Sequence, residues 1–244
     1  MKRFIITVCL FLITCFTTFA QNNRPVLIDG ASSYDIRSYG YYHEDKSLKA
    51  TIDTLIKLKQ SGKLIELTPG RTFNKGFTQS YWWIVFDVHN TLTEPVHLFF
   101  NERSNSINQL QLFKVDSTGK VTPMALTGDH FKFHSRPVNY HNYLYPIKLK
   151  ANEKASYFLW ADKRGQNIVM PLSLAKDVDL VHAEIPFYTI FGIFVGIYLF
   201  AILFNIFLFI SLRDKIHLYY ALYVICILIF NLEVERSAFQ WLYP

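Results

Sequence analysis

The chain has 244 residues, a formal net charge of +6 and 51% hydrophobic residues. Its basic residues are scattered and form no run, which excludes a nucleic-acid-binding patch. Cys9 and Cys15 lie near the N-terminus and Cys226 lies in an apolar stretch, so the polar segment between them has no disulfide and needs an ordinary hydrophobic core.

The first 20 residues have the layout of a secretory signal peptide. Lys2 and Arg3 precede an apolar run from Phe4 to Phe16, and Thr18-Phe19-Ala20 offers small residues at a cleavage site. An uncleaved membrane anchor is the alternative. We expect residues 1–20 to be removed and the mature chain to begin at Gln21, outside the cytoplasm.

Residues 21–180 have the pattern of a β-rich domain. Short segments of alternating polarity are separated by turn residues such as Asp116 to Gly119 and Lys150 to Glu153. The predicted strands are 80–89, 96–101, 109–115, 143–149 and 155–161. This spacing predicts a β-sandwich. Residues 47–64 differ, because their apolar residues recur at helical spacing, and we expect one short amphipathic helix there.

One face of the 80–89 strand contains candidate ligand-binding residues. Trp83, Asp87 and His89 alternate with apolar residues, and Tyr81 lies two residues before Trp83. An aromatic ring beside polar groups suits a sugar, whose C–H face stacks on the ring while its hydroxyls form hydrogen bonds. The alternative is that Trp83 covers a second layer of core, where large aromatics usually lie.

Other polar residues support weaker hypotheses. Arg136 could clamp an anionic ligand through its planar guanidinium, or pin a loop by binding backbone carbonyls. His130, His134 and His141 match no known spacing of metal ligands, so we predict no metal site. No phosphate-binding loop, nucleophile elbow or His-Glu-x-x-His motif is present, and we expect neither a cofactor nor catalysis.

Two long apolar runs follow a short link at 177–184. Residues 186–212 contain no charge and exceed the ~20 residues that span a bilayer, and residues 216–232 form a second, shorter run. The loop between them holds Arg213 and Lys215, and basic loops stay in the cytoplasm. We therefore expect residues 21–180 outside and residues 233–244 at the start of an outer loop.

Small and polar residues within the first apolar run indicate helix packing. Gly192 and Gly196 form a Gly-x-x-x-Gly pair, which allows helices to approach closely. Asn205 is expected to link neighbouring helices by a hydrogen bond. Dimerisation through the glycines is the alternative to packing within one bundle.

Motifs spread along the whole mature chain resemble one receptor family. They are Asn74 to Phe77, Tyr81 to Trp83, Asn108 to Phe113, Thr127 to Asp129, Arg136-Pro137, Gly192 to Gly196, Phe204-Asn205, Arg213-Asp214, Tyr219 to Tyr223 and Phe239 to Pro244. Their order is similar to that in bacterial seven-transmembrane receptors with diverse intracellular signalling modules. The resemblance implies an extracellular jelly-roll domain that binds carbohydrate or another small ligand, then membrane helices and a cytoplasmic signalling module. His217 departs from the family, which usually has an aromatic residue there.

These observations predict a receptor, or its N-terminal fragment, in the bacterial inner membrane with a periplasmic outer domain. The chain stops after the second predicted helix, so the remaining helices and the signalling module would be partners in cis or trans. The ligand would be a small molecule or a saccharide. The alternative is an envelope assembly protein whose outer domain docks another protein. A concave pocket would favour ligand sensing, whereas a flat apolar patch would favour docking.

Overall fold

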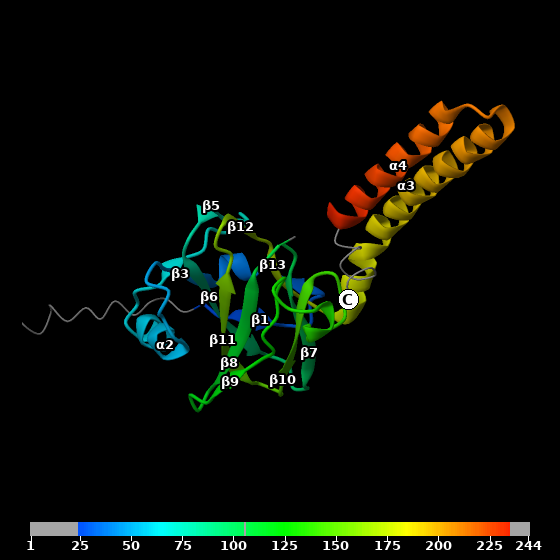
Figure 1. Ribbon diagram of the computed structural model, residues 1–244. Coiled ribbons are helices and arrows are strands. Elements are labelled where there is room, and N and C mark those ends of the chain that lie inside the picture. The colour runs from blue at the N-terminus through cyan, green and yellow to red at the C-terminus, as the bar shows by residue number, and fades with distance from the viewer. Residues whose placement is uncertain (1–23, 105, 235–244) are drawn as a thin grey trace, which may run out of the picture.

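The computed structural model describes residues 24–104 and 106–234. The predicted signal peptide and most of the predicted outer loop at 233–244 lie outside this part of the chain. A β-rich outer domain comes first, and a pair of long helices follows it (Figure 1). The strands are β1 (Val26–Ile28), β2 (Ser33–Tyr34), β3 (Gly40–Asp45), β4 (Ile65–Glu66), β5 (Phe73–Thr78), β6 (Tyr81–Asn90), β7 (Val96–Glu102), β8 (Gln109–Asp116), β9 (Val121–Pro123), β10 (Tyr143–Leu149), β11 (Lys154–Asp162), β12 (Gln166–Met170) and β13 (Leu172–Ala175). The helices are α2 (Ile52–Gln60), α3 (Asp177–Leu212) and α4 (Lys215–Val234), with 3-10 turns at Ile36–Ser38 and Phe133–Ser135.

Two sheets form the outer domain. The larger has the order β4-β3-β6-β11-β8-β9, with β1 parallel to the end of β6, and the smaller has the order β10-β7-β13-β2. Strands β5 and β12 form a separate two-stranded sheet. The five strands predicted from sequence correspond to β6, β7, β8, β10 and β11, each within one residue at either end. The predicted fold, a mainly β, jelly-roll-like sandwich followed by helices of membrane length, is confirmed.

The main core lies between the two sheets. Ile84, Phe86 and Val88 of β6 point into it, as their alternation predicts. Phe86 stacks on Phe100 of the smaller sheet with 5.6 Å between ring centroids. Phe86 also stacks on its cross-strand neighbour Tyr157 at 5.4 Å. These fully buried rings hold the two sheets face to face.

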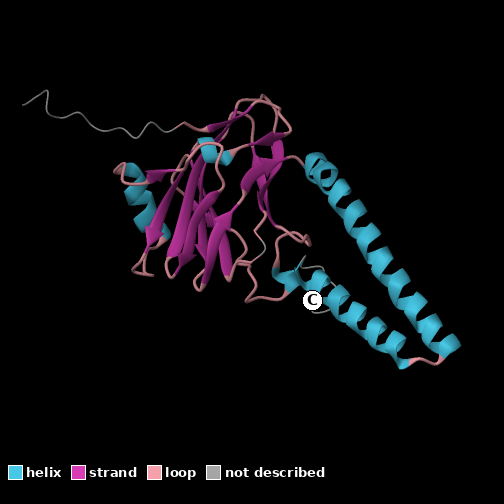
Figure 2. Ribbon diagram, turned by 90° about the horizontal axis from the view of Figure 1, so that it is seen from above, coloured by secondary structure: helices cyan, strands magenta, loops and turns pink. Residues whose placement is uncertain are grey.

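Helix α2 is shorter than the predicted helix at 47–64. Leu48 has a φ of +58°, which breaks a helix, and the Asp45 carboxylate accepts hydrogen bonds from the backbone N–H groups of Ser47 and Ala50. The helix begins after Thr51, whose hydroxyl forms a capping box with Thr54. In Figure 2, α2 lies against the larger sheet, on the side away from α3 and α4.

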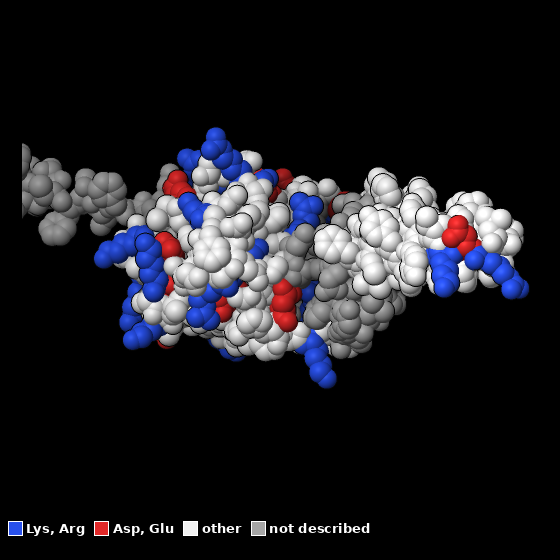
Figure 3. All heavy atoms as spheres, turned by 45° about the horizontal axis from the view of Figure 1, so that its top comes forward, with Lys and Arg blue, Asp and Glu red and all other residues white. Residues whose placement is uncertain are grey.

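Helices α3 and α4 form an antiparallel pair that extends from the sandwich (Figures 1 and 2). Two stretches within them, Tyr188–Leu212 and Lys215–Leu232, are long and apolar enough to cross a membrane, with mean hydropathies of 2.7 and 1.7. Figure 3 shows the pair almost free of charge except at the turn between the helices. Arg213 ends α3 with a φ of +54°, and the Asp214 carboxylate caps α4 at the N–H of Ile216.

The segment predicted as a link, 177–184, is instead the first part of α3. Asp177 and Asp179 lie in the first turn, where negative charge is favoured by the helix dipole. The outer domain therefore joins the membrane segment through continuous helix. No flexible linker separates β13 from α3, because only Lys176 lies between them.

Candidate functional site

The outward face of β6 contains the residues predicted to bind a ligand. Tyr81, Trp83, Asp87 and His89 share this face, opposite the residues that enter the main core. The five-residue span from Trp83 to Asp87 is partly covered by α2, which packs its apolar side on the sheet. The helix therefore divides the face into two partly buried ends.

Trp83 lies beneath α2 and is only 3% exposed. It belongs to a second core with Leu55 of α2 and with Tyr41, Val85 and Phe158 of the sheet. That Trp83 stacks on a ligand stays a prediction, and the burial of its ring does not favour it. The alternation of polarity gave the correct face but could not indicate that a helix from elsewhere in the chain covers it.

Asp87 and His89 line a pocket at one end of α2. Its volume is about 370 Å³, and its lining residues are Pro25, Lys59, Asp87, Val88, His89, Val115, Asp116, Ser117, Lys154, Ala155 and Ser156. Residues from α2, β6, β8 and β11 thus meet here. The pocket is lined by charged groups of both signs, and none of the described residues that line it is Phe, Tyr or Trp.

A hydrogen-bonded trio forms one wall of this pocket. Lys59 of α2 forms an ion pair with Asp87, and its ammonium donates a hydrogen bond to the Ser156 hydroxyl at 2.7 Å. Ser156 donates in turn to Oδ1 of Asp87 at 2.5 Å. Ser156 lies directly across from Asp87 in the β6–β11 register, which brings the two side chains to the same face. The trio fixes the carboxylate, and His89 and Lys154 are among the other residues that line the pocket.

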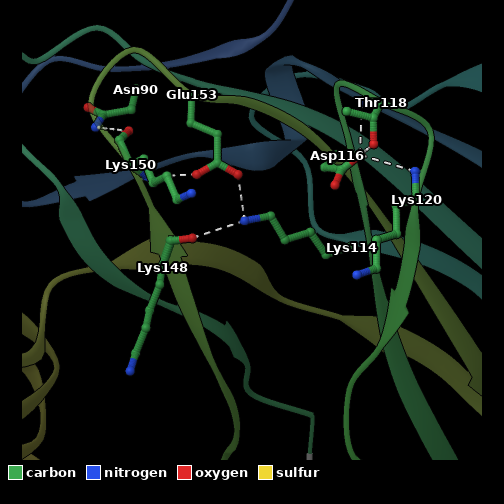
Figure 4. Close-up of polar contacts among 8 residues, drawn as sticks. All are labelled: Asn90, Lys114, Asp116, Thr118, Lys120, Lys148, Lys150 and Glu153. Carbon is green, nitrogen blue, oxygen red and sulfur yellow. Dashed lines mark hydrogen bonds and ion pairs between the residues drawn. The ribbon is translucent and has the colours of Figure 1, made fainter.

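The β8–β9 turn forms another wall and is fixed by Asp116 (Figure 4). Oδ1 of Asp116 accepts hydrogen bonds from the Thr118 hydroxyl at 2.6 Å and from the Lys120 backbone N–H at 3.0 Å. The hydrogen bond from the Thr118 hydroxyl is the main cause that lowers the pKa of Asp116. Asp116 thus remains ionised at neutral pH and holds the turn in one conformation.

An ion pair joins β8 to the β10–β11 turn close to this wall (Figure 4). The Lys114 ammonium lies 2.7 Å from Oε1 of Glu153 and donates to the Lys148 carbonyl at 3.1 Å. Burial acts to raise the pKa of Glu153, but hydrogen bonds from Lys114 and from the Lys150 N–H outweigh it, and the pKa is lowered. This pair ties β8 to the β10–β11 turn.

Tyr81 lies at the other end of the β6 face. It is six residues from Asp87, about 20 Å along the strand, so the two do not share one small ligand. Tyr81 packs edge-on against half-buried Trp160 with 5.1 Å between centroids, and the Arg164 guanidinium lies 4.7 Å above its ring. Trp160 lies across from Trp83 in the β6–β11 register. Trp160 was not among the predicted site residues, because the polarity pattern around it resembles that of a core strand.

Arg136 is buried, with an exposed fraction of 5%. Its guanidinium lies between the rings of Phe133 and Tyr143 and donates to the carbonyls of Tyr140 at 2.9 Å and His141 at 2.6 Å. These contacts fit the alternative role, in which Arg136 pins its loop through backbone carbonyls. That Arg136 clamps a ligand stays a prediction.

This loop contacts the beginning of α3. His141 Nδ1 lies 2.9 Å from the Tyr188 hydroxyl, and the two rings are 5.7 Å apart. Leu180 of α3 packs with Leu144 and Ala175 of the sandwich in a small separate core. The outer domain is therefore attached to α3 through both the chain and side-chain contacts.

The predicted packing residues of the first apolar helix lie on different sides of α3. Asn205 faces α4: its Oδ1 is 3.4 Å from His217 Nδ1, while its amide donates to the Ala201 carbonyl at 2.8 Å. Gly192 and Gly196 are exposed, and within the described residues a Cβ added at either position would meet nothing within 4 Å. Their role in close packing stays a prediction that concerns helices other than α4.

Two family models match the chain. The model described as 7TMR-DISM extracellular 2 matches residues 37–176, which cover most of the sandwich. The model described as 7TM diverse intracellular signalling matches residues 187–244, which include the apolar parts of α3 and α4. No curated protein matches the chain.

Two solved structures are similar to part of this chain. TmCBM61 in complex with beta-1,4-galactotriose has 9% identity and a TM-score of 0.31, covering 57% of this chain and 90% of that one. An exo-beta-1,3-galactanase from Phanerochaete chrysosporium with beta-1,3-galactotriose has 8% identity and a TM-score of 0.27, covering 61% of this chain and 29% of that one. At these scores neither likeness indicates a ligand for this chain.

Proposed function

We propose that this chain, which belongs to the 7TMR-DISM family and is a membrane receptor with an extracellular domain, binds a small polar ligand beside Asp87. A saccharide is the ligand class that we favour. We further infer that the receptor lies in a bacterial cytoplasmic membrane, faces the periplasm and senses its ligand without catalysing a reaction.

The observation that carries the proposal is the convergence of hydrogen-bonding groups of both kinds on one pocket of about 370 Å³. Asp87 is an acceptor, Lys154 is a donor, and the His89 imidazole can act as both. Each hydroxyl of a sugar also donates and accepts, so a polyol matches such a wall better than an apolar ligand does. Since no Phe, Tyr or Trp lines this pocket in the described part of the chain, recognition there would rest on hydrogen bonds and not on ring stacking.

Signal transfer would use the attachment of the sandwich to α3. Ligand binding would favour one of two packings of α3 against the 133–142 loop and Leu144, where Leu180 and Tyr188 make their contacts. Further membrane helices and a cytoplasmic signalling module, in cis or in trans, would receive the change. Gly192 and Gly196 would be positions at which such helices approach α3.

A thermal-shift screen tests the proposed ligand pocket. The full chain in nanodiscs would be screened against saccharides and other small polyols, because a ligand that binds the native state raises its melting temperature. We expect a hit whose shift is lost in His89→Ala. The matched control is His97→Ala, which removes an exposed histidine from the smaller sheet.

Two results would contradict the proposal. An equal loss of the shift in both histidine variants would mean that the ligand does not bind beside His89. No shift with any small ligand would instead favour the alternative function, in which the outer domain docks another envelope protein.

A further inference from the structure

We propose that the outer domain has a second binding site, a groove beside β1 that takes a short free peptide in extended form. The groove has a volume of about 700 Å³, within the range of ligand sites, and its lining residues come from 24–29 and 31–39. It has only Pro25 in common with the pocket beside Asp87. The inference therefore does not depend on the function proposed above.

The edge of β1 that faces away from β6 can accept another strand. The Ile28 carbonyl accepts a hydrogen bond from the Thr91 N–H at 3.0 Å, so the peptide groups of Ile28 point toward β6. Since these groups alternate in direction along a strand, the N–H and C=O of Leu27 point to the opposite edge. Among the described residues neither group of Leu27 has a hydrogen-bond partner. Leu27 lines the groove, so an extended peptide there can form both bonds.

The two ends of the groove carry opposite charges. Arg24 and Asp29 both line it and are exposed, and five residues of extended chain, about 17 Å, separate them. Oδ1 of Asp29 accepts hydrogen bonds from the Ala31 N–H at 3.2 Å and the Tyr34 hydroxyl at 3.3 Å, which fix the carboxylate. A peptide of about five residues that runs antiparallel to β1 would place its amino group at Asp29 and its carboxylate at Arg24. Charge complementarity therefore favours a peptide with free termini.

The middle of the groove is more apolar than its ends. Leu27 is 51% exposed and Tyr39 is 39% exposed, and both line the groove. Asp35, the remaining carboxylate of the lining, is already bound by Arg37, which donates from Nε at 2.7 Å and from Nη2 at 3.0 Å. This middle part suits the apolar side chains that alternate along an extended peptide.

Pro25 limits the length of a strand that can be added. It has no N–H and lies two residues before Leu27, on the same outward-facing edge. Strand β1 itself has only three residues. Short edges with a proline protect a sheet from pairing with a long strand of another molecule. A short peptide therefore fits this edge better than a second copy of the chain does.

One wall of the groove is bonded to the junction with α3. The N–H of Lys176 donates to the Ser32 carbonyl at 3.0 Å, and its ammonium donates to the Gly30 carbonyl at 2.6 Å. Tyr34, which lines the groove, pairs with Leu174 at the end of β13. A peptide in the groove would therefore act on the joint by which the sandwich is attached to the membrane segment.

Calorimetric titration of the full chain in nanodiscs with the pentapeptide Thr-Val-Thr-Val-Thr tests this site. We expect the peptide with free termini to bind about tenfold more tightly than its N-acetylated or its C-amidated form, because each modification removes one charged contact. Asp29→Asn should weaken binding of the free peptide by a similar factor and leave the affinity for the acetylated form unchanged. Arg24→Gln should weaken binding of the free peptide but not of the amidated form. The asparagine keeps an oxygen that can accept from Ala31 and Tyr34, so the loop should stay folded.

Matched controls isolate the site from general effects. Asp53→Asn and Arg71→Gln each remove an exposed charge outside the groove. Both should leave the affinity for the free peptide unchanged, as should His89→Ala, whose effect belongs to the other pocket. Failure of one site is therefore distinguishable from failure of the other.

Three calorimetric results would overturn the proposal: no binding of the free peptide at millimolar concentration, equal affinities for the free and the blocked peptides, or equal losses in Asp29→Asn and Asp53→Asn. Light scattering of the chain in detergent gives a further test. A dimer that Asp29→Asn disrupts would assign the edge of β1 to a second copy and would also overturn the assignment to a peptide.

Discussion

Trp83 and Trp160 lie across from each other on adjacent strands, yet their surroundings differ. Trp83 is covered by α2 and 3% exposed, whereas Trp160 is half-buried at the edge of the second core. The period-two pattern of β6 correctly indicates which side chains share a face. It carries no information about which of them a distant helix covers, and this is why Asp87 and His89 line a pocket while Trp83 does not.

Trp83→Ala should destabilise the outer domain by about 3–5 kcal/mol, the usual cost of truncating a buried aromatic side chain. Trp160→Ala should cost less, because its ring is already partly in water. Denaturant unfolding of both variants measures the difference. Equal losses would mean that α2 does not cover Trp83 in solution.

Glu153→Gln should reduce the loss of stability in acid. The folded-state pKa of Glu153 is lowered, so its contribution to stability is present above its ordinary pKa of 4.5 and is lost as the pH falls through the folded value. Thermal unfolding from about pH 5 to about pH 3 should therefore show a shallower decline in the variant than in the wild type. Glu94→Gln, at an exposed position, is the control and should follow the wild type.

Among the elements, α2 determines the shape of the candidate site. Apolar spacing predicted a helix there but not its limits, since Leu48 and the Asp45 turn are shaped by tertiary contacts and local hydrogen bonds. Strands β5, β12 and β13 were not predicted, because they are short or bulged and lack regular alternation. The long strands were predictable because burial on one face imposes a period of two.

Leu55→Ala tests whether α2 is held on the sheet by its apolar side. Leu55 is fully buried in the second core, so truncation should cost about 2–5 kcal/mol. Lys57→Ala, on the exposed side of the same helix, should change stability little. Denaturant unfolding gives both values, and a small effect of Leu55→Ala would argue against tight packing of α2.

At the scale of the whole molecule, the polar sandwich and the apolar helix pair meet at a short junction, where only Lys176 separates β13 from α3. The apolar runs and the basic turn between them could be predicted from the sequence, because a helix that spans a membrane needs a long uncharged stretch and basic loops stay in the cytoplasm. That α3 continues into the outer domain could not be predicted, because its first turns are polar and resemble a linker. That continuity gives the receptor a direct mechanical connection between Ala175 and the membrane segment.

Cysteine labelling tests the membrane orientation. In a Cys226→Ser background, Lys57→Cys in the outer domain should react with an impermeant maleimide in intact cells. Lys215→Cys, in the turn between α3 and α4, should react only after permeabilisation, because basic loops stay in the cytoplasm. Labelling of Lys215→Cys in intact cells would contradict the predicted membrane orientation.

Hydrogen–deuterium exchange on the full chain in nanodiscs, with and without a ligand found by the thermal-shift screen, tests most directly whether the pocket beside Asp87 communicates with α3. We predict slower exchange on ligand binding around the pocket, in the turn after β8 and in the last turn of α2. We also predict altered exchange at 138–142 and in the first turns of α3, where the sandwich and helix are in contact. Slower exchange at the pocket with none at the junction would contradict transmission through α3, and no change at the pocket would contradict the ligand site itself.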